Sequence, residues 1–210
     1  MIFNNFELKS MLYTIIALLI AIIPHEVAHG YAAYILGDET AKTDGRLSFN
    51  PINHIDPIGL LSMIIFRFGW AKAVPINPYK FNCNRKFGTI IVSLAGVFVN
   101  FVIAFVVGVI GVRPIVSGEP MSKLLFEIMW YNVMLGVFNL VPVPPLDGSK
   151  VVASLLPNRL EYYFYKYERY LYIFLLIGIF SSTINRIIGP IIIKIINLFL
   201  NTGIKLWTLM

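Results

Sequence analysis

The strongest chemical signal in the sequence is a pair of histidines four residues apart that flank a glutamate, His25-Glu26-Val27-Ala28-His29. Residues i and i+4 of a helix lie on the same face, so His25 and His29 can bind one metal ion together. Glu26 is rotated by about 100° from His25, which brings its carboxylate within reach of a water molecule on that metal. The spacing therefore predicts a catalytic metal centre with Glu26 as the base.

The surroundings of this string strengthen the metal interpretation. In a soluble helix such a short match is often accidental, and the two histidines can simply form hydrogen bonds. Here the string lies inside an apolar stretch, and ionisable residues at the depth of a bilayer are costly and usually functional. The setting therefore favours a metal site.

A third ligand is expected from Asp147. A catalytic zinc ion takes three protein ligands and keeps a fourth position for water. Asp147 follows Pro142, Pro144 and Pro145, which cannot continue a helix and are expected to hold an extended segment. One Zn²⁺ with ionised Asp147 and Glu26 has no net charge, which suits a low-dielectric site. Alternatively, Asp147 is an ordinary N-cap of the helix that follows it.

Three more polar residues are candidates for the site. Asn100 lies deep in an apolar stretch, where it should bond a neighbouring helix or, alternatively, the substrate backbone. Asn139 or Asn100 could steady the substrate or its oxyanion. His54, the last histidine of the chain, is either an accessory ligand or gate residue, or a loop histidine at the interface.

The composition predicts an integral membrane protein. Of the 210 residues, 58% are hydrophobic and 13% are charged, whereas a soluble domain is about half apolar and a quarter charged. The net charge of +6 does not indicate nucleic-acid binding, because no basic run accompanies it, and it fits loops that face anionic lipid. The single cysteine excludes an internal disulfide.

The apolar stretches predict one membrane domain over residues 1–210. We expect an all-α polytopic fold with about five transmembrane helices, a re-entrant segment and a small amphipathic β-hairpin. The expected spans cover residues 11–34, 88–112, 124–141, 167–182 and 187–204, and the re-entrant and hairpin region covers residues 57–82. The last apolar stretch could instead lie in the interface. The first is expected to be retained, because it lacks the basic n-region of a signal peptide.

The distribution of Lys and Arg predicts the orientation. Most of them fall in residues 35–87 and 149–170. We place these segments and the C-terminal tail in the cytoplasm and the N-terminus outside. The protein is then expected in the cell membrane with its active site towards the cytoplasmic side.

Three motifs together resemble the site-2 protease family of intramembrane zinc metalloproteases. They are the H-E-x-x-H string, the S-L-A-G-x-x-x-N motif from Ser93 to Asn100, and the N-x-x-P-x-P-P-L-D-G segment from Asn139 to Gly148. The resemblance implies that His25, His29 and Asp147 are the zinc ligands and Glu26 the catalytic base. It also implies that Asn139 lies near the site and that residues 67–77 form a membrane re-entrant β-hairpin that guides substrate.

The chain departs from the family pattern in two respects. Val97 stands where many members have a proline after the glycine of the second motif. The sequence also lacks recognisable PDZ and CBS domains and a helix before the one with His25, so we expect a minimal form.

The resemblance implies hydrolysis of peptide bonds in or near the transmembrane segments of other proteins, which releases a cytoplasmic fragment. The expected cofactor is one Zn²⁺, and the expected partners are transmembrane substrates and the lipid bilayer, without nucleic acid. Two alternatives are a zinc-binding scaffold that does not cut and a metal transporter. The intact Glu26 argues against the scaffold, and the gathering of metal-binding residue types at one depth argues against the transporter.

Overall fold

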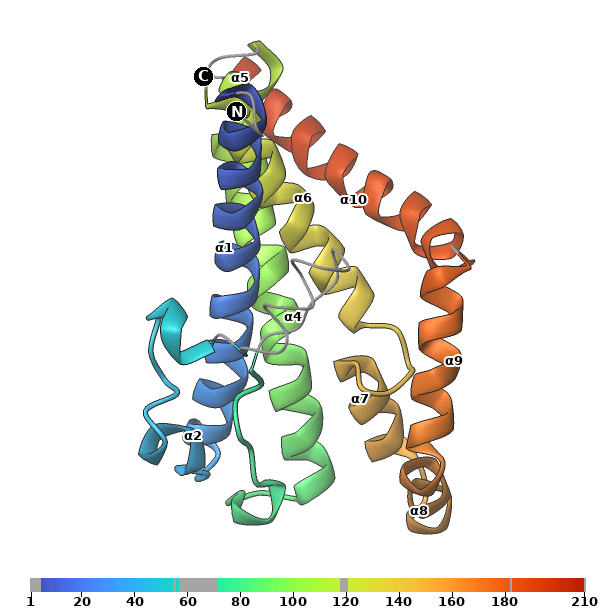
Figure 1. The fold of residues 1–210 in the computed structure, drawn as a ribbon. Coiled ribbons are helices and arrows are strands. Elements are labelled where there is room, and N and C mark those ends of the chain that lie inside the picture. Colours follow the sequence, from blue (N-terminus) through green and yellow to red (C-terminus); the bar gives the residue numbers. More distant parts are fainter. Residues whose placement is uncertain (1–4, 55, 57–71, 118–120, 182, 210) are drawn as a thin grey trace.

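A computed structural model describes residues 5–54, 56, 72–117, 121–181 and 183–209, and all regular structure within these ranges is helical (Figure 1). The long helices are α1 (Asn5–Ile35), α4 (Arg85–Ile110), α6 (Ser122–Asn139) and α10 (Thr183–Thr208). The shorter ones are α2 (Thr40–Thr43), α5 (Val112–Ser117), α7 (Asp147–Leu155), α8 (Asn158–Lys166) and α9 (Glu168–Phe180), with the 3₁₀ turns η1 (Pro51–His54) and η2 (Pro78–Lys80).

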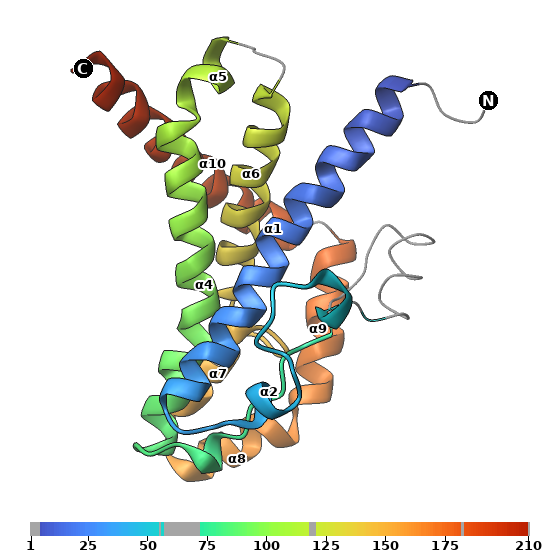
Figure 2. The same ribbon diagram turned by 90° about the vertical axis from the view of Figure 1, so that its left-hand side faces the viewer.

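The centre of the molecule is the packing of α1, α4 and α6 against one another, with α10 across α4 and α6 (Figures 1 and 2). Two of these helices contribute apolar residues at every fourth position, which places the side chains on one face. The buried cluster consists of Ala104 of α4, Met129, Val133 and Val137 of α6, and Ile188, Ile192 and Ile196 of α10. This cluster holds α4, α6 and α10 together, and α1 packs against α4 and α6.

The prediction of five spans is wrong, because three helices of the described chain are long and apolar enough to cross a membrane. They are Lys9–Ile35 in α1, Arg85–Ile110 in α4 and Arg186–Thr208 in α10. The expected span at 167–182 contains α9, whose 13 residues reach about 20 Å against a hydrocarbon core of about 30 Å. The expected span at 124–141 corresponds to α6, an 18-residue helix that packs against both α1 and α4.

A charged residue of α6 is accommodated by a polar contact with a neighbouring helix. Glu127 near its start accepts a hydrogen bond of 2.9 Å from the Thr14 hydroxyl of α1. The charge is thus satisfied by a neighbouring helix. Because α6 is shielded by its neighbours, a strictly apolar surface is not required of it.

The predicted β-hairpin is also wrong, since no strand occurs among the residues described. Residues 57–71 of the expected re-entrant and hairpin region lie outside the described ranges. Residues 72–77 are irregular, and two of their backbone amides bond side chains: the amide of Val74 donates to Glu26 and that of Asn77 to Asp38. Side-chain acceptors take the place that a neighbouring strand would fill.

The start of α1 and the end of α10 lie at the same end of the molecule, away from α2, α7 and α8 (Figures 1 and 2). The expected orientation, with the N-terminus outside and the C-terminal tail in the cytoplasm, stays a prediction.

Candidate metal centre

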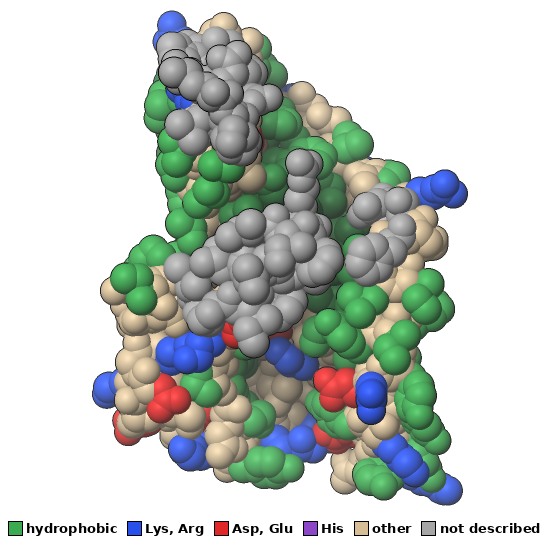
Figure 3. Space-filling model, viewed as in Figure 1, with side chains coloured by type: hydrophobic (Ala, Val, Ile, Leu, Met, Phe, Trp, Pro, Cys, Tyr) green, Lys and Arg blue, Asp and Glu red, His purple; other side chains and the backbone are tan. Residues whose placement is uncertain are grey.

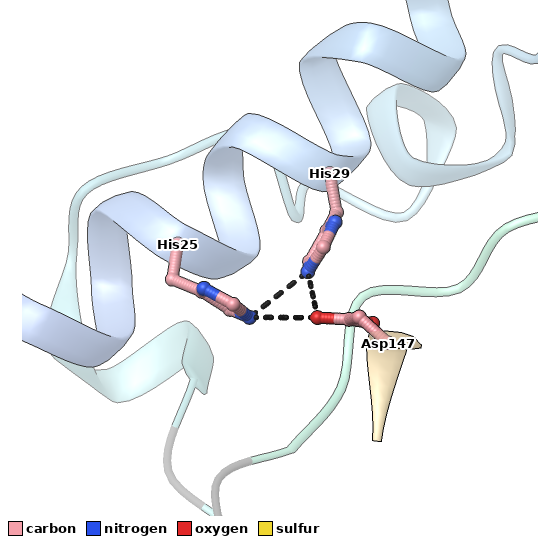
Figure 4. Close-up of side chains that lie close together, drawn as sticks. All are labelled: His25, His29 and Asp147. Atoms are coloured by element: carbon pink, nitrogen blue, oxygen red, sulfur yellow. Dashed lines mark hydrogen bonds and ion pairs between the residues drawn. The ribbon is translucent and has the colours of Figure 1, made fainter. Parts of the chain in front are cut away.

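Three potential ligand atoms meet between α1 and α7 (Figure 4). Nε2 of His25 and Nε2 of His29 lie 2.9 Å apart. Oδ2 of Asp147 lies 3.2 Å from the first nitrogen and 3.0 Å from the second. All three side chains are buried, with at most 5% of each residue exposed. Within the described residues, this is the group of His, Cys, Asp or Glu side chains that could hold a metal ion.

Hydrogen bonds on the far side of each imidazole fix its tautomer. His29 Nδ1 lies 2.7 Å from the Val92 carbonyl, which can only accept, so Nδ1 carries the proton. His25 Nδ1 lies 2.7 Å from Asn100 Oδ1. The Asn100 amide nitrogen is already used to donate to Ala21 O and to Asn132 Oδ1, each at 2.9 Å. His25 Nδ1 must therefore be the donor as well.

Both Nε2 atoms consequently present lone pairs, and they face a carboxylate oxygen. Three acceptor atoms within 3.2 Å of one another, and away from water, repel each other unless a cation lies among them. A triangle with sides of about 3 Å has its corners about 1.8 Å from its centre, which is compatible with Zn–N and Zn–O bonds of about 2.0–2.2 Å. The residues present fit one zinc ion.

The segment before α7 presents Asp147 as a compact turn, so the prediction of an extended proline segment is wrong. The amide of Val143 donates to Val141 O at 2.8 Å, and that of Leu146 donates to Val143 O at 3.1 Å. The chain then passes so close to itself that a Cβ on Gly148 would lie 2.8 Å from Val141 O. Asp147 is the first residue of α7.

The carboxylate of Asp147 is bound on both oxygens, which argues against the N-cap alternative. Oδ2 faces the two histidines, and Oδ1 lies 2.9 Å from Nζ of Lys150, one turn along α7. The positive charge of Lys150 stabilises the ionised carboxylate and counteracts the cost of its burial. Asp147 is therefore ionised and ready to bind a cation.

Gly96 lets α4 pass directly against the two imidazoles. A Cβ at this position would lie 2.5 Å from His29 Nε2 and 2.7 Å from His25 Nδ1, which is too close for any side chain. The small-residue motif in the second apolar stretch therefore serves the site itself, whichever residue follows the glycine.

We expect the Gly96→Ala variant to bind zinc at least tenfold more weakly, because the added methyl group displaces both histidines. Competition with a chromogenic chelator in detergent measures the affinity. Gly189→Ala is the matched control, because a Cβ there would meet no atom within 4 Å. Equal zinc affinities of the two variants would contradict this account of Gly96.

Glu26 lies on the next position of α1 and is partly buried. Its Oε2 accepts a hydrogen bond of 3.0 Å from the backbone amide of Val74. One carboxylate oxygen is thus held by the segment that passes over α1. The other oxygen is the atom that can receive a proton.

The structure separates the remaining sequence candidates. Asn100 is completely buried and orients His25, which corresponds to the neighbouring-helix interpretation. Asn139 is half-buried at the C-terminal end of α6. His54 is buried in η1, where its Nε2 lies 2.6 Å from Ser48 O, and it does not belong to the metal-binding group.

Sequence reasoning missed two residues that support the ligands. Asn132 is completely buried on α6 and links Asn100 to the Ile128 carbonyl, 2.8 Å from its amide nitrogen. The signal was present, because an amide within an apolar stretch was the reason for choosing Asn100. Lys150 could have been found from its i+3 spacing to Asp147.

We expect Asn100→Ala to weaken zinc binding by about 10- to 100-fold, as is usual for the loss of a residue that orients a ligand. The variant leaves His25 Nδ1 without its acceptor and frees the imidazole to rotate. Chelator competition measures the affinity. Asn158→Ala, a change of an exposed asparagine on α8, is the control. Unchanged affinity of Asn100→Ala would show that His25 needs no such support.

Comparison with known proteins gives a consistent result. The model of peptidase family M50 matches residues 112–184. "Putative zinc metalloprotease YwhC" of Bacillus subtilis is 34% identical over 198 residues, which cover 90% of each chain. "Zinc metalloprotease MJ0392" of Methanocaldococcus jannaschii is 26% identical over 77% of this chain and 39% of its own. "Putative zinc metalloprotease Rip2" of Mycobacterium tuberculosis is 24% identical over 80% of this chain and 66% of its own. No solved structure matches the chain.

Proposed function

The chain belongs to peptidase family M50, the site-2 protease family of zinc metalloproteases, and from this premise we propose that it hydrolyses peptide bonds in or near the transmembrane segments of other membrane proteins. The depth of the metal-binding group carries the proposal. His25 lies ten residues, or about 15 Å, before the end of the apolar stretch Lys9–Ile35. A peptide bond that reaches this group must enter the layer that the apolar helices occupy.

In the proposed mechanism, His25, His29 and Asp147 would hold the zinc ion, which would supply Lewis acidity and lower the pKa of water at the site. Glu26 accepts the proton of the attacking water and later delivers it to the leaving amine. The Val74 amide holds one oxygen of Glu26, so the carboxylate keeps its direction while the proton moves. The Nε2 lone pairs of the two imidazoles stay directed at the Asp147 carboxylate oxygen because their Nδ1 protons are bound.

We further propose that the end of the molecule with α2, α7 and α8 faces the cytoplasm in the cell membrane. Charged side chains gather around this end, whereas the flank above it is mostly apolar (Figure 3). Lys and Arg near the ends of membrane helices favour the cytoplasmic side. The α1 end nearest the metal-binding group is the end that adjoins α2. Substrates would then be cut towards their cytoplasmic ends.

Reconstitution tests the proposed function. The purified chain is placed in liposomes with single-span substrates, and mass spectrometry locates the cut. We expect cleavage within or next to the apolar segment, loss of cleavage with 1,10-phenanthroline, and recovery on addition of Zn²⁺. Cleavage confined to water-soluble flanks would contradict the proposal. Zinc uptake into the liposomes without cleavage would support a transporter instead.

A further inference from the structure

The segment of residues 72–77 is tied to three other parts of the chain through its backbone. The amide of Lys72 donates to the His54 carbonyl at 2.9 Å, and that of Asn77 donates to Asp38 Oδ2 at 2.6 Å. Between these ends, the amide of Val74 donates to Glu26 Oε2 at 3.0 Å. The segment therefore crosses α1 at the residue expected to act as the base.

The Val74 side chain sets the register of this crossing. Gly30 lies four residues after Glu26, on the same face of α1. A Cβ on Gly30 would lie 2.9 Å from Cγ1 of Val74, so the missing side chain makes room for the valine. Side-chain packing and the amide hydrogen bond thus fix the same residue against two successive turns of α1.

Arg46 binds the same segment from another direction. Its Nη2 donates to the carbonyl of Lys72 and, at 3.2 Å, to the carbonyl of Ala73. The residue is only 5% exposed, and its own amide is fixed by a hydrogen bond of 2.9 Å to Ala41 O. Within the described ranges its guanidinium forms no salt bridge with a carboxylate, and Nε has no hydrogen-bond partner. Among the described residues the buried guanidinium is thus held by backbone carbonyls, and burial of a cation in this way is costly.

The Ala73–Val74 peptide group connects Arg46 to Glu26. The Ala73 carbonyl and the Val74 amide belong to one planar peptide group, in which C=O and N–H point in opposite directions. Arg46 holds the carbonyl side of this plane, and Glu26 accepts from the amide side. A cation on the carbonyl also polarises the N–H and strengthens its hydrogen bond. Arg46 therefore acts on Glu26 through one rigid group.

We propose that Arg46 is a positioning residue for the peptidase reaction, which fixes the Ala73–Val74 peptide plane so that its N–H directs the Glu26 carboxylate at the metal centre. This inference rests on the proposed function. A general base contributes fully only when it is held in the geometry of proton transfer, and a glutamate has three side-chain torsions to restrain. Irregular backbone without a strand partner needs an external support to provide this restraint.

The test uses the full chain in liposomes with a single-span substrate, and kcat is expressed per bound zinc ion. Arg46→Met keeps the length of the side chain and removes its donors. We expect its kcat to fall about tenfold or more, with KM within about twofold and one zinc ion per chain. Arg46→Lys retains a donor for the Ala73 carbonyl, so its kcat per zinc should be at least threefold higher than that of Arg46→Met. Arg159→Gln, a change of an exposed arginine on α8, should leave kcat unchanged.

A second pair of variants examines the amide itself. Val74→Pro removes the amide hydrogen that donates to Glu26. Val74→Ala shortens the side chain but keeps this amide hydrogen. We expect kcat per zinc of the proline variant to lie at least fivefold below that of the alanine variant.

Three results would overturn the inference: a wild-type kcat per zinc in Arg46→Met, loss of zinc from that variant, or equal kcat of the two Val74 variants. Failure of the unaltered chain to cleave, or full activity of Glu26→Gln, would instead refute the proposed function on which the inference rests.

Discussion

Replacing Glu26 by glutamine is expected to lower kcat by about 10²- to 10⁴-fold while one zinc ion per chain remains bound. Glutamine has the shape of glutamate, and its carbonyl oxygen can still accept the hydrogen bond from the Val74 amide. It cannot take a proton from water at neutral pH. The variant therefore removes the chemistry of the base and keeps the architecture around it.

The measurement is the initial rate of substrate cleavage in liposomes, with zinc determined by mass spectrometry on the same preparation. Glu39→Gln is the matched control, because Glu39 is exposed next to α2 and the same change should leave the rate unaltered. Retention of the wild-type rate by Glu26→Gln would exclude Glu26 as the base. Loss of zinc from this variant would assign Glu26 to metal binding instead.

The second large effect is expected at Asp147, whose replacement by asparagine should weaken zinc binding by at least about 100-fold. Loss of a residue that only orients a ligand typically costs 10- to 100-fold, and the loss of a ligand should exceed this range. An amide oxygen carries no net charge, so it offsets the dication poorly. The Lys150 ammonium would in addition lose its anionic partner and repel the ion.

Competition with a chelator of known affinity measures this effect. Asp44→Asn is the control, because the structure leaves Asp44 exposed after α2. The two variants change the total charge equally, so a difference between them reflects the local contact. Equal zinc affinities would remove Asp147 from the ligand set.

Much of the metal-binding group could be predicted from the sequence because local geometry determines it. The spacing of His25 and His29 places both imidazoles on one face of any helix that contains them. Asp147 lies more than 100 residues further along the chain. It could be proposed only because the residues before it stop a helix at a matching depth and because a zinc ion needs a third ligand.

The membrane topology was less accessible to sequence reasoning. Hydropathy depends only on the residue types of a segment. It does not show which helices pack against that segment and cover its polar side chains. For α6, the 18-residue length and the charge of Glu127 become acceptable because the helix packs against α1 and α4 and Thr14 bonds the carboxylate. For α9, apolar composition suggested a span, although the helix has only 13 residues.

The sequence by itself determined the chemistry: a dyad of histidines, a neighbouring glutamate and a distant aspartate, all in an apolar setting that makes charge costly without a metal. Only the tertiary structure decided how these groups are held. Segments far apart in the chain meet at three places: Asn100 bonds His25, Gly96 leaves space for the two imidazoles, and Arg46 supports residues 72–77. The physical reason is that residue type and spacing fix what a side chain can do, whereas its direction depends on partners that only packing brings within hydrogen-bond distance.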